Sequence, residues 1–150
     1  MLRILFDELG DAHSDIFLKI DAMPTFLQVA DTYYLGDFLG SDSETKKEDV
    51  LNYLTYFKTK ILELTEQESF IAFDLSDEYI GGLFMRKSKK GIIKTQYGIS
   101  EKLQGWRVGQ GNIDELVNQV RPDFSIDSEW LLSADSVLYG LDWSLAKING

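Results

Sequence analysis

The chain contains no cysteine, only two prolines and a single histidine among its 150 residues. The absence of cysteine excludes disulfide bonds, thiolate catalysis and cysteine-ligated zinc or iron–sulfur sites. With His13 as the only histidine, neither a two-histidine zinc motif nor a two-histidine ribonuclease site can be assembled. A Ser-His-Asp triad would also depend on His13, and no Gly-x-Ser-x-Gly motif accompanies it. We therefore expect a protein that is not an enzyme and uses no cofactor, with His13 as an ordinary turn residue.

Long apolar runs are absent as well. No segment approaches the roughly 20 apolar residues that a membrane-spanning helix needs. The first residues, Met1 to Glu8, reach acidic side chains too early for a signal peptide. A reducing compartment is compatible with the lack of cysteine. These features predict a cytoplasmic protein that does not bind membranes.

The overall composition is that of an ordinary folded domain. Hydrophobic residues make up 44% of the chain and charged residues 27%, which is typical of globular proteins and not of disordered ones. A chain of this length can bury enough apolar surface to fold without a metal or a disulfide. We expect a single α+β domain over residues 1–150.

The clearest helix signal follows a predicted loop over Gly36–Thr45. Thr45 and Glu48 fit a capping box, in which each side chain accepts a hydrogen bond from the backbone N–H of the other residue. Apolar residues then recur at helical spacing, which predicts a helix over about residues 46–66. The residues that carry this periodicity are Val50, Leu54, Phe57, Ile61 and Leu64.

The segment after this helix alternates with a period of two residues, which is typical of strands. Short turns separate three such stretches, so we predict an antiparallel meander. Gly81 and Gly82 interrupt the second strand and indicate a bulge, a sharp coil or a closely packed neighbour, for which a crossing helix is the simplest candidate. The predicted strands are Ser69–Ser76, Glu78–Arg86 and Ile93–Ile99.

Two further helices are predicted towards the C-terminus. Asn112 and Glu115 fit a second capping box, opening a helix at 113–120 that ends before Pro122. Apolar spacing from Ala134 to Ile148 predicts a last helix, with Ser133 as its cap, although Gly140 costs it about 1 kcal/mol.

The first forty residues are less regular. Asp15–Ile20 and Thr25–Ala30 read as two strands, and Asp31–Leu39 as a third strand or an aromatic loop. Because strands and helices do not alternate regularly, a doubly wound parallel sheet is not expected. The predicted fold class is α+β: a curved antiparallel meander packed against a long helix and a C-terminal helix.

Several segments could suggest a ligand site, but none matches a defined motif. The glycines that precede the helix at 113 lack the third glycine of a dinucleotide fingerprint and the lysine of a phosphate-binding loop. The acidic clusters at Asp74–Glu78 and Asp123–Asp127 do not fit the calcium loop. We therefore predict no metal site. Five bases from Arg86 to Lys94 surround a predicted hairpin tip without interleaved aromatics, and lysines there also discourage aggregation of sheet edges.

Charge is the most informative property that remains. The chain has a net charge of −10, which disfavours nucleic acids and anionic membranes and favours a basic protein partner. The first fifty residues alone contain eleven acids and four bases. Acids alternate there with aromatic residues, either as a docking surface or with Tyr33, Leu35 and Phe38 in the core. The predicted partner-binding residues are Asp31, Tyr33, Tyr34, Asp37, Asp42 and Glu44, with Asp77 and Glu78 as a second place for the interface.

Four predicted segments carry a resemblance to a known family: the helix after Thr45, the following Phe70–Leu83 segment with its glycine pair, the lysine-tipped hairpin and the closing helix. Together they resemble bacterial immunity proteins of contact-dependent growth inhibition and related polymorphic-toxin systems. Some of these proteins are similar to the Whirly fold of curved antiparallel sheets, which the glycine pair would suit. The resemblance implies an immunity protein that occludes the basic surface of a toxin, expected to be a nuclease. A non-catalytic adaptor or regulatory protein with another partner is the alternative.

Overall fold

The computed structural model describes residues 1–150, except for the side chain of Ser128. It confirms the α+β class: two antiparallel sheets and four α-helices, with two short 3-10 turns. Along the chain the elements are β1 (Leu2–Phe6), β2 (Ile16–Ile20), β3 (Gln28–Ala30), α1 (Leu35–Leu39), α2 (Lys46–Leu62), β4 (Ser69–Leu75), β5 (Ile80–Lys87), β6 (Ile92–Ser100), η1 (Gly105–Arg107), α3 (Ile113–Val120), η2 (Arg121–Asp123), β7 (Ser125–Ser133) and α4 (Ala134–Asn149).

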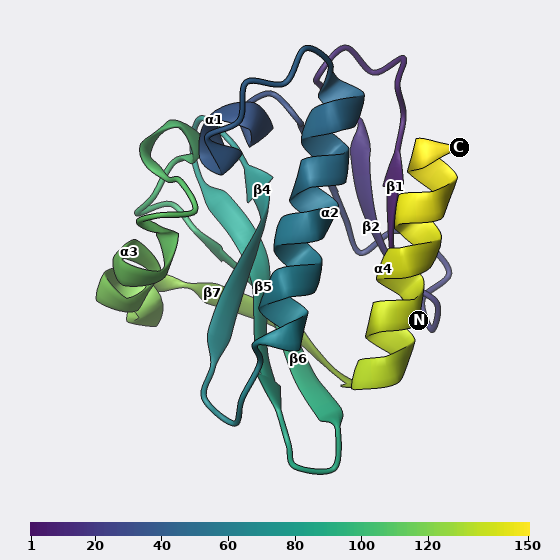
Figure 1. The fold of residues 1–150 in the computed structure, drawn as a ribbon. Coiled ribbons are helices and arrows are strands. Elements are labelled where there is room, and N and C mark those ends of the chain that lie inside the picture. The colour runs from purple at the N-terminus through teal and green to yellow at the C-terminus, as the bar shows by residue number, and fades with distance from the viewer.

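Both sheets are meanders in which neighbours in sequence are neighbours in space. The strand orders are β1-β2-β3 and β4-β5-β6-β7, and every pairing is antiparallel. The helices α2 and α4 lie side by side and α4 also packs along β1 (Figure 1). The α3 helix lies apart from that pair and contacts β4 (Figure 1). The predicted meander is therefore confirmed, and it is one strand longer than predicted.

The long helix α2 begins where its cap predicts. The side chain of Thr45 accepts a hydrogen bond from Glu48 N at 3.2 Å. The reciprocal half of the predicted capping box is wrong, because the Glu48 carboxylate accepts from Glu44 N instead, at 3.3 Å. The helix ends at Leu62, four residues before the predicted end, so Leu64 reaches the core from the following turn.

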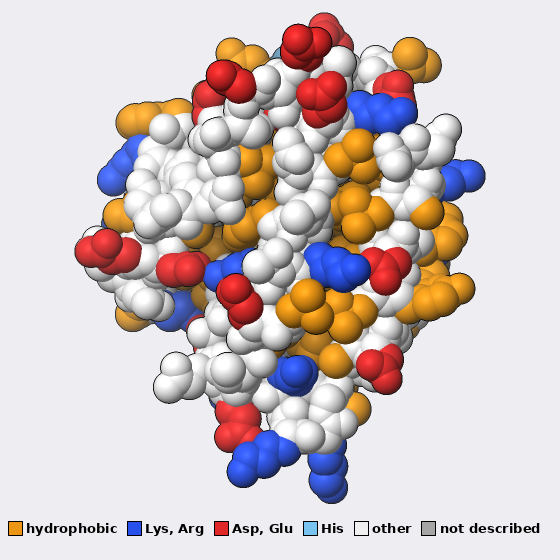
Figure 2. Space-filling view, in the orientation of Figure 1, with side chains coloured by type: hydrophobic (Ala, Val, Ile, Leu, Met, Phe, Trp, Pro, Cys, Tyr) orange, Lys and Arg blue, Asp and Glu red, His pale blue; other side chains and the backbone are white. Residues whose placement is uncertain are grey.

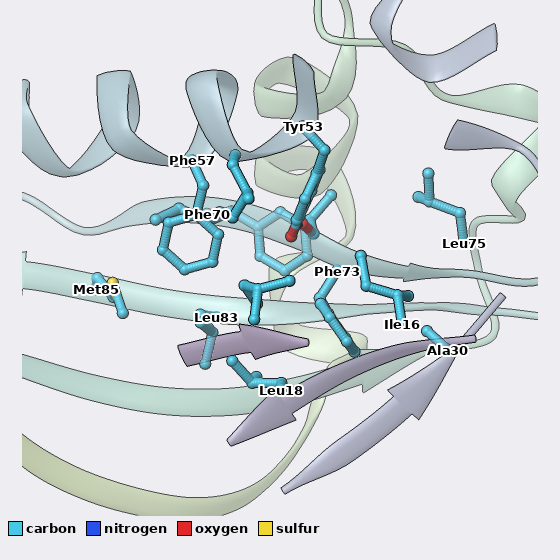
Figure 3. Close-up of a cluster of buried hydrophobic side chains, with 14 of the residues drawn as sticks. Ile16, Leu18, Ala30, Tyr53, Phe57, Phe70, Phe73, Leu75, Leu83 and Met85 are labelled. Carbon is cyan, nitrogen blue, oxygen red and sulfur yellow. The ribbon is translucent and has the colours of Figure 1, made fainter. Parts of the chain in front are cut away.

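The core lies between α2 and strands of both sheets. Tyr53 and Phe57 point from α2 towards Leu83 of β5, with Leu18 of β2 on the further side (Figure 3). All four side chains are fully buried. Aromatic side chains each bury a large apolar area, so the high aromatic content of the chain is used mainly to fill this space.

The glycine pair in β5 faces side chains of its own sheet. The pairing of β4 with β5 shifts between Ala72 and Asp74. A bulge, one of the three predicted reasons for the glycines, is therefore present, but its extra residue lies in β4, opposite the glycine pair. A Cβ on Gly81 would lie 2.6 Å from the Tyr97 hydroxyl, and a Cβ on Gly82 would lie 2.3 Å from the Ile71 carbonyl oxygen. The predicted crossing helix is therefore wrong as the reason for these glycines, since Tyr97 and β4 occupy the space that a side chain would need.

Gly140 in α4 is also explained by a neighbouring strand that leaves no room for a side chain. A Cβ there would lie 1.9 Å from the carbonyl oxygen of Leu2, so the absence of a side chain lets the helix approach β1 closely. One turn later, the Ser144 hydroxyl accepts a hydrogen bond from Ile4 N at 2.9 Å. The predicted cap at Ser133 is confirmed, because its hydroxyl accepts from Ser136 N. The glycine that weakens the helix in isolation therefore serves its packing.

The remaining predictions hold in part. The strands near the N-terminus are confirmed in shortened form as β2 and β3, and the helix at 113–120 has the predicted bounds. Its capping box is wrong, because the Asn112 side chain accepts from Gly109 N at 2.7 Å and not from the helix. The segment after Asp31 is neither a strand nor wholly a loop, since residues 35–39 form α1. The strands β1 and β7 were not predicted.

Candidate functional site

A hollow with a volume of about 440 Å³ collects several of the predicted binding residues. Three segments that are distant in sequence form it: the β1–β2 loop, the segment between β3 and α1, and the end of β4 with the turn that follows. Asp77, predicted as part of a separate interface, lies here beside the residues around Tyr33. The lining residues are His13, Asp31, Tyr33, Tyr34, Leu75, Ser76 and Asp77.

A buried carboxylate holds the central segment of this hollow in place. Asp15, 1% exposed at the start of β2, accepts hydrogen bonds from Thr32 N at 3.0 Å and from the Thr32 hydroxyl at 2.8 Å. Thr32 is fully buried. A charged group with two such partners is strongly oriented, so this contact sets the direction in which Asp31 and Tyr33 leave the core.

The β1–β2 loop supplies the second wall in a strained conformation. Asp11, Ala12 and Ser14 have φ values of 54°, 66° and 47°, a region that residues with a side chain rarely occupy. Ser14 N donates to Asp31 Oδ1 at 2.6 Å, and His13 Nδ1 lies 3.8 Å from Asp31 Oδ2. Such strain, of order 1 kcal/mol per residue, persists when surrounding contacts hold the backbone. Here those contacts place His13 beside Asp31.

Aromatic rings line the hollow together with the half-buried Asp31 and the exposed Asp77. The rings of Tyr33 and Tyr34 meet edge to face, with centroids 4.9 Å apart, and His13 stacks on Tyr33 at 6.0 Å. Tyr33 is 55% exposed, so the core interpretation is wrong for this residue, although Leu35 and Phe38 are buried. The Tyr34 hydroxyl donates a hydrogen bond to Asp77. That bond raises the pKa of Tyr34 to about 12, so the phenol keeps its proton at physiological pH.

A further acid lies behind the hollow in β4. Asp74 is 6% exposed. Burial raises its pKa from 3.8 to about 6; Tyr79 opposes the shift by hydrogen bonding, and the nearby charge of Asp31 adds to it. The negative charge of this region therefore increases as the pH rises through about 6. Sequence reasoning noted Asp74 only as part of a cluster, because nothing local showed that it would be buried.

The other predicted residues do not line the hollow. Asp37, Asp42, Glu44 and Glu78 are exposed, but they lie outside its walls. Asp42 and Glu44 occupy the connection between α1 and α2. Acidic side chains gather at the end of the molecule where α2 begins, and basic ones project from the opposite end (Figure 2). Half of the predicted residues, Asp31, Tyr33, Tyr34 and Asp77, therefore lie together in the hollow.

Two residues of the site were not among the predicted binding residues. His13 was interpreted as an ordinary turn residue, yet it forms a wall of the hollow. Asp15 was counted only as the first residue of a strand. A signal for Asp15 does exist, because an acid adjoining the apolar Ile16, Leu18 and Ile20 pattern must find a buried partner. No comparable local signal points to His13.

The hollow has the chemistry of a cation site for a side chain. Two carboxylates accept hydrogen bonds from a lysine or arginine, and the tyrosine rings offer their faces to the same charge. Among the residues that the structure describes, no three histidine, aspartate or glutamate side chains are grouped as metal ligands would be. A larger hollow of about 570 Å³ lies between α2 and the segment around Gln110. It contains none of the predicted residues, and its Lys60 is paired with Asp114.

Comparison with protein-family models, with curated proteins and with solved structures gives no match. Within the described residues, none of the helices combines the length and the apolar character that a membrane crossing requires.

Proposed function

We propose that this protein binds a basic protein partner at its acidic end, and that the partner is a toxin domain which it neutralises as an immunity protein in the cytoplasm. The observation that carries the proposal is the hollow between Asp31 and Asp77. It joins carboxylates and exposed tyrosine rings from separate parts of the chain. The resemblance of the α2-to-β5 segment and the lysine-tipped hairpin to immunity proteins supplies the class of partner.

The hollow fits the anchor residue of such a complex. A lysine or arginine entering it would meet the carboxylates of Asp31 and Asp77 and the ring of Tyr33, which all line the hollow. A buried anchor of this kind typically contributes about 2 kcal/mol or more to binding. The surrounding acids Asp37, Asp42, Glu44 and Glu78 act at longer range, where they speed the encounter with a cationic surface.

Neutralisation follows from competition. A nuclease toxin needs a cationic groove to hold its polyanionic substrate. An acidic partner that covers the groove removes those charges from the substrate and blocks access to the catalytic residues. A complex of ordinary size buries about 1,600 Å² in total, enough to cover such a groove.

The test is co-expression with the product of the adjacent gene, followed by a binding measurement with the purified pair. Tyr33→Ala and Asp77→Lys should each weaken binding at least tenfold, about 1.4 kcal/mol. Two matched controls are available: Tyr139→Ala, at a tyrosine that is 67% exposed on α4, and Asp123→Lys, at an exposed acid in η2. Both controls should bind as the unchanged protein does.

Two results would contradict the proposal in different ways. If the site variants and the controls lose affinity equally, the hollow is not the anchor. If the adjacent product is neither toxic nor bound, and a regulatory complex is captured through the same residues, the adaptor alternative holds and the toxin assignment fails.

A further inference from the structure

The strand β7 leaves one edge of the larger sheet open. The strand order places β4 and β7 at the two ends, so each has a row of backbone groups that no strand of this sheet can pair. At β4 the helix α2 supplies partners to one residue of that row: the Tyr53 hydroxyl donates to Ala72 O at 2.5 Å, and Ala72 N donates to the Tyr56 hydroxyl at 3.4 Å. The strand β3 of the smaller sheet also contacts β4. Within the described part of the chain, β7 pairs with β6 and with no other strand.

The free edge has little of the protection that edge strands usually carry. Proline, lysine and bulges are the common devices. β7 contains neither proline nor lysine. It has one bulge, at Asp127, which leaves a regular stretch from residue 128 to Ser133. The row from Trp130 to Ser133 contains no charged residue. Just before it, Glu129 forms an ion pair with Lys94 of the same chain at 3.3 Å, so Asp127 is the acid of β7 that is free to meet a second copy.

An exposed apolar patch adjoins this edge. Leu131 is 70% exposed and Ile92, on the neighbouring strand, is 41% exposed. Both line a hollow of about 360 Å³ that extends from β7 over one face of the sheet to Lys94 of β6 and Arg86 of β5. Apolar exposure next to a free strand marks a surface that gains stability when a second strand covers it.

The charges near this edge differ between the start and the end of β7. The first part of β7 carries Asp127 and Glu129, which are both exposed. Its last residue, Ser133, pairs with Ile92 at the base of the β5–β6 turn, and Ala134 N donates to Gly91 O at 2.8 Å. Lys89 and Lys90 are exposed in that turn, which lies at the end of the molecule from which basic side chains project (Figures 1 and 2). The edge thus begins beside acids and ends beside the two lysines of the turn, with one acid, Asp135 in the first turn of α4, next to them.

We propose that β7 pairs with β7 of a second copy of this chain, antiparallel about a two-fold axis at Leu131, so that two four-stranded sheets become one. In this arrangement Leu131 of one copy covers Leu131 of the other. The acidic start of each β7 lies beside the lysine-bearing turn of the other copy, and both contacts are made twice, as two-fold symmetry requires. A parallel arrangement would place acids beside acids and lysines beside lysines.

A strand of another protein could use the same backbone groups, but the observations favour a second copy. The charge gradient is self-complementary only for an antiparallel pair of identical strands. Strand pairing alone covers less than the roughly 1,200 Å² of a standard interface. The contacts at the two turns add to it, and we expect a dimer that dissociates on dilution. The inference does not depend on the proposed function, because the acidic hollow is formed by other segments.

Sedimentation equilibrium over a range of protein concentrations tests the inference. The unchanged chain should show a monomer–dimer equilibrium. Leu131→Lys places two lysines together on the axis and should weaken dimerisation at least tenfold. Leu62→Lys is the matched control, because Leu62 is 62% exposed on α2, away from β7, and this variant should dimerise normally. Circular dichroism of both variants shows whether the fold is retained.

Charge reversal provides a second, independent test. Lys89→Glu with Lys90→Glu makes the turn acidic, and Asp127→Lys with Glu129→Lys makes the strand basic. Each double variant alone should be impaired in dimerisation, since like charges then meet at both contacts. An equal mixture should recover association, because the acidic turn of one meets the basic strand of the other. A chain that is monomeric at all concentrations, a dimer unaffected by Leu131→Lys, or a mixture without recovery would each overturn the inference.

Discussion

The two edge strands of the larger sheet differ in whether other parts of the chain hydrogen-bond to their outer backbone groups. At β4, the hydroxyls of Tyr53 and Tyr56 take up both backbone groups of Ala72, so a helix supplies hydrogen-bond partners at this point of the edge. At β7 the row from Trp130 to Ser133 has no such cover in the described structure. The smaller sheet repeats the first solution, since Ser144 of α4 accepts from Ile4 N in β1. At these positions, hydroxyl groups of the packed helices therefore form the hydrogen bonds that a further strand would otherwise form.

The largest effect is expected at Gly140, where the close approach of α4 to β1 requires the absence of a side chain. Gly140→Ala places a Cβ 1.9 Å from the Leu2 carbonyl oxygen, so α4 must move away from β1. We expect a loss of about 3 kcal/mol of unfolding free energy, measured by urea denaturation, because overpacking against backbone cannot be relieved by a rotamer change. Gly111→Ala is the control, since a Cβ there meets nothing within 4 Å. Equal stability of both variants would show that α4 does not need this close approach.

A somewhat smaller effect is expected at the end of the closed strand β4, where Asp74 is buried. Its pKa is raised from 3.8 to about 6 in the folded protein, so the folded state binds the proton more tightly than the unfolded chain does. This group therefore contributes most stability at low pH, and the contribution is lost as the pH rises from about 4 to about 6. Asp74→Asn should increase the unfolding free energy by about 2 kcal/mol at neutral pH.

The difference between Asp74→Asn and the unchanged chain should disappear below about pH 4, where the carboxyl is protonated in both states. Urea denaturation of both proteins across this pH range measures it. A difference that is independent of pH would mean that burial of the charge is not its cause.

The smallest effect tests the tyrosine closure directly. Tyr53→Phe removes the hydroxyl that donates to Ala72 O and leaves the ring in the core. The buried carbonyl oxygen then lacks this partner, which should cost about 1–2 kcal/mol. Tyr139→Phe, at an exposed tyrosine, should change nothing. Faster amide hydrogen exchange in β4 than in β5 would locate the loss at the edge, whereas uniform exchange would argue against the closure.

The elements that were predicted correctly carry their signal within a few residues. α2 follows from Thr45 and the apolar spacing after it, and the β4–β5–β6 meander follows from alternation between short turns. The strand β7 was not predicted because its bulge at Asp127 interrupts the two-residue alternation of apolar and polar residues. Trp130, Leu131 and Leu132 then form an unbroken apolar run. α1 has only five residues and no side-chain cap, so it depends on its neighbours for stability.

The residues of the candidate site also divide into those that the local sequence could identify and those that it could not. Local density of acids and tyrosines was enough to select Asp31, Tyr33 and Tyr34 as binding residues, a role that stays a prediction. Their meeting with Asp77 and His13 was not predictable, because it requires the β1–β2 loop and the end of β4 to lie together. Asp77 itself had been assigned to a separate surface.

Composition, charge and periodicity were sufficient for the α+β class, the long helix, the meander and the acidic character of one part of the chain. These properties are sums or repeats over residues that are neighbours in the sequence, so they can be recognised without a structure. The closure of β4 and β1, the exposure of β7 and the raised pKa of Asp74 depend on which distant groups come into contact. Burial and hydrogen bonding act over a few ångströms in space, and only the folded chain decides which residues lie that close.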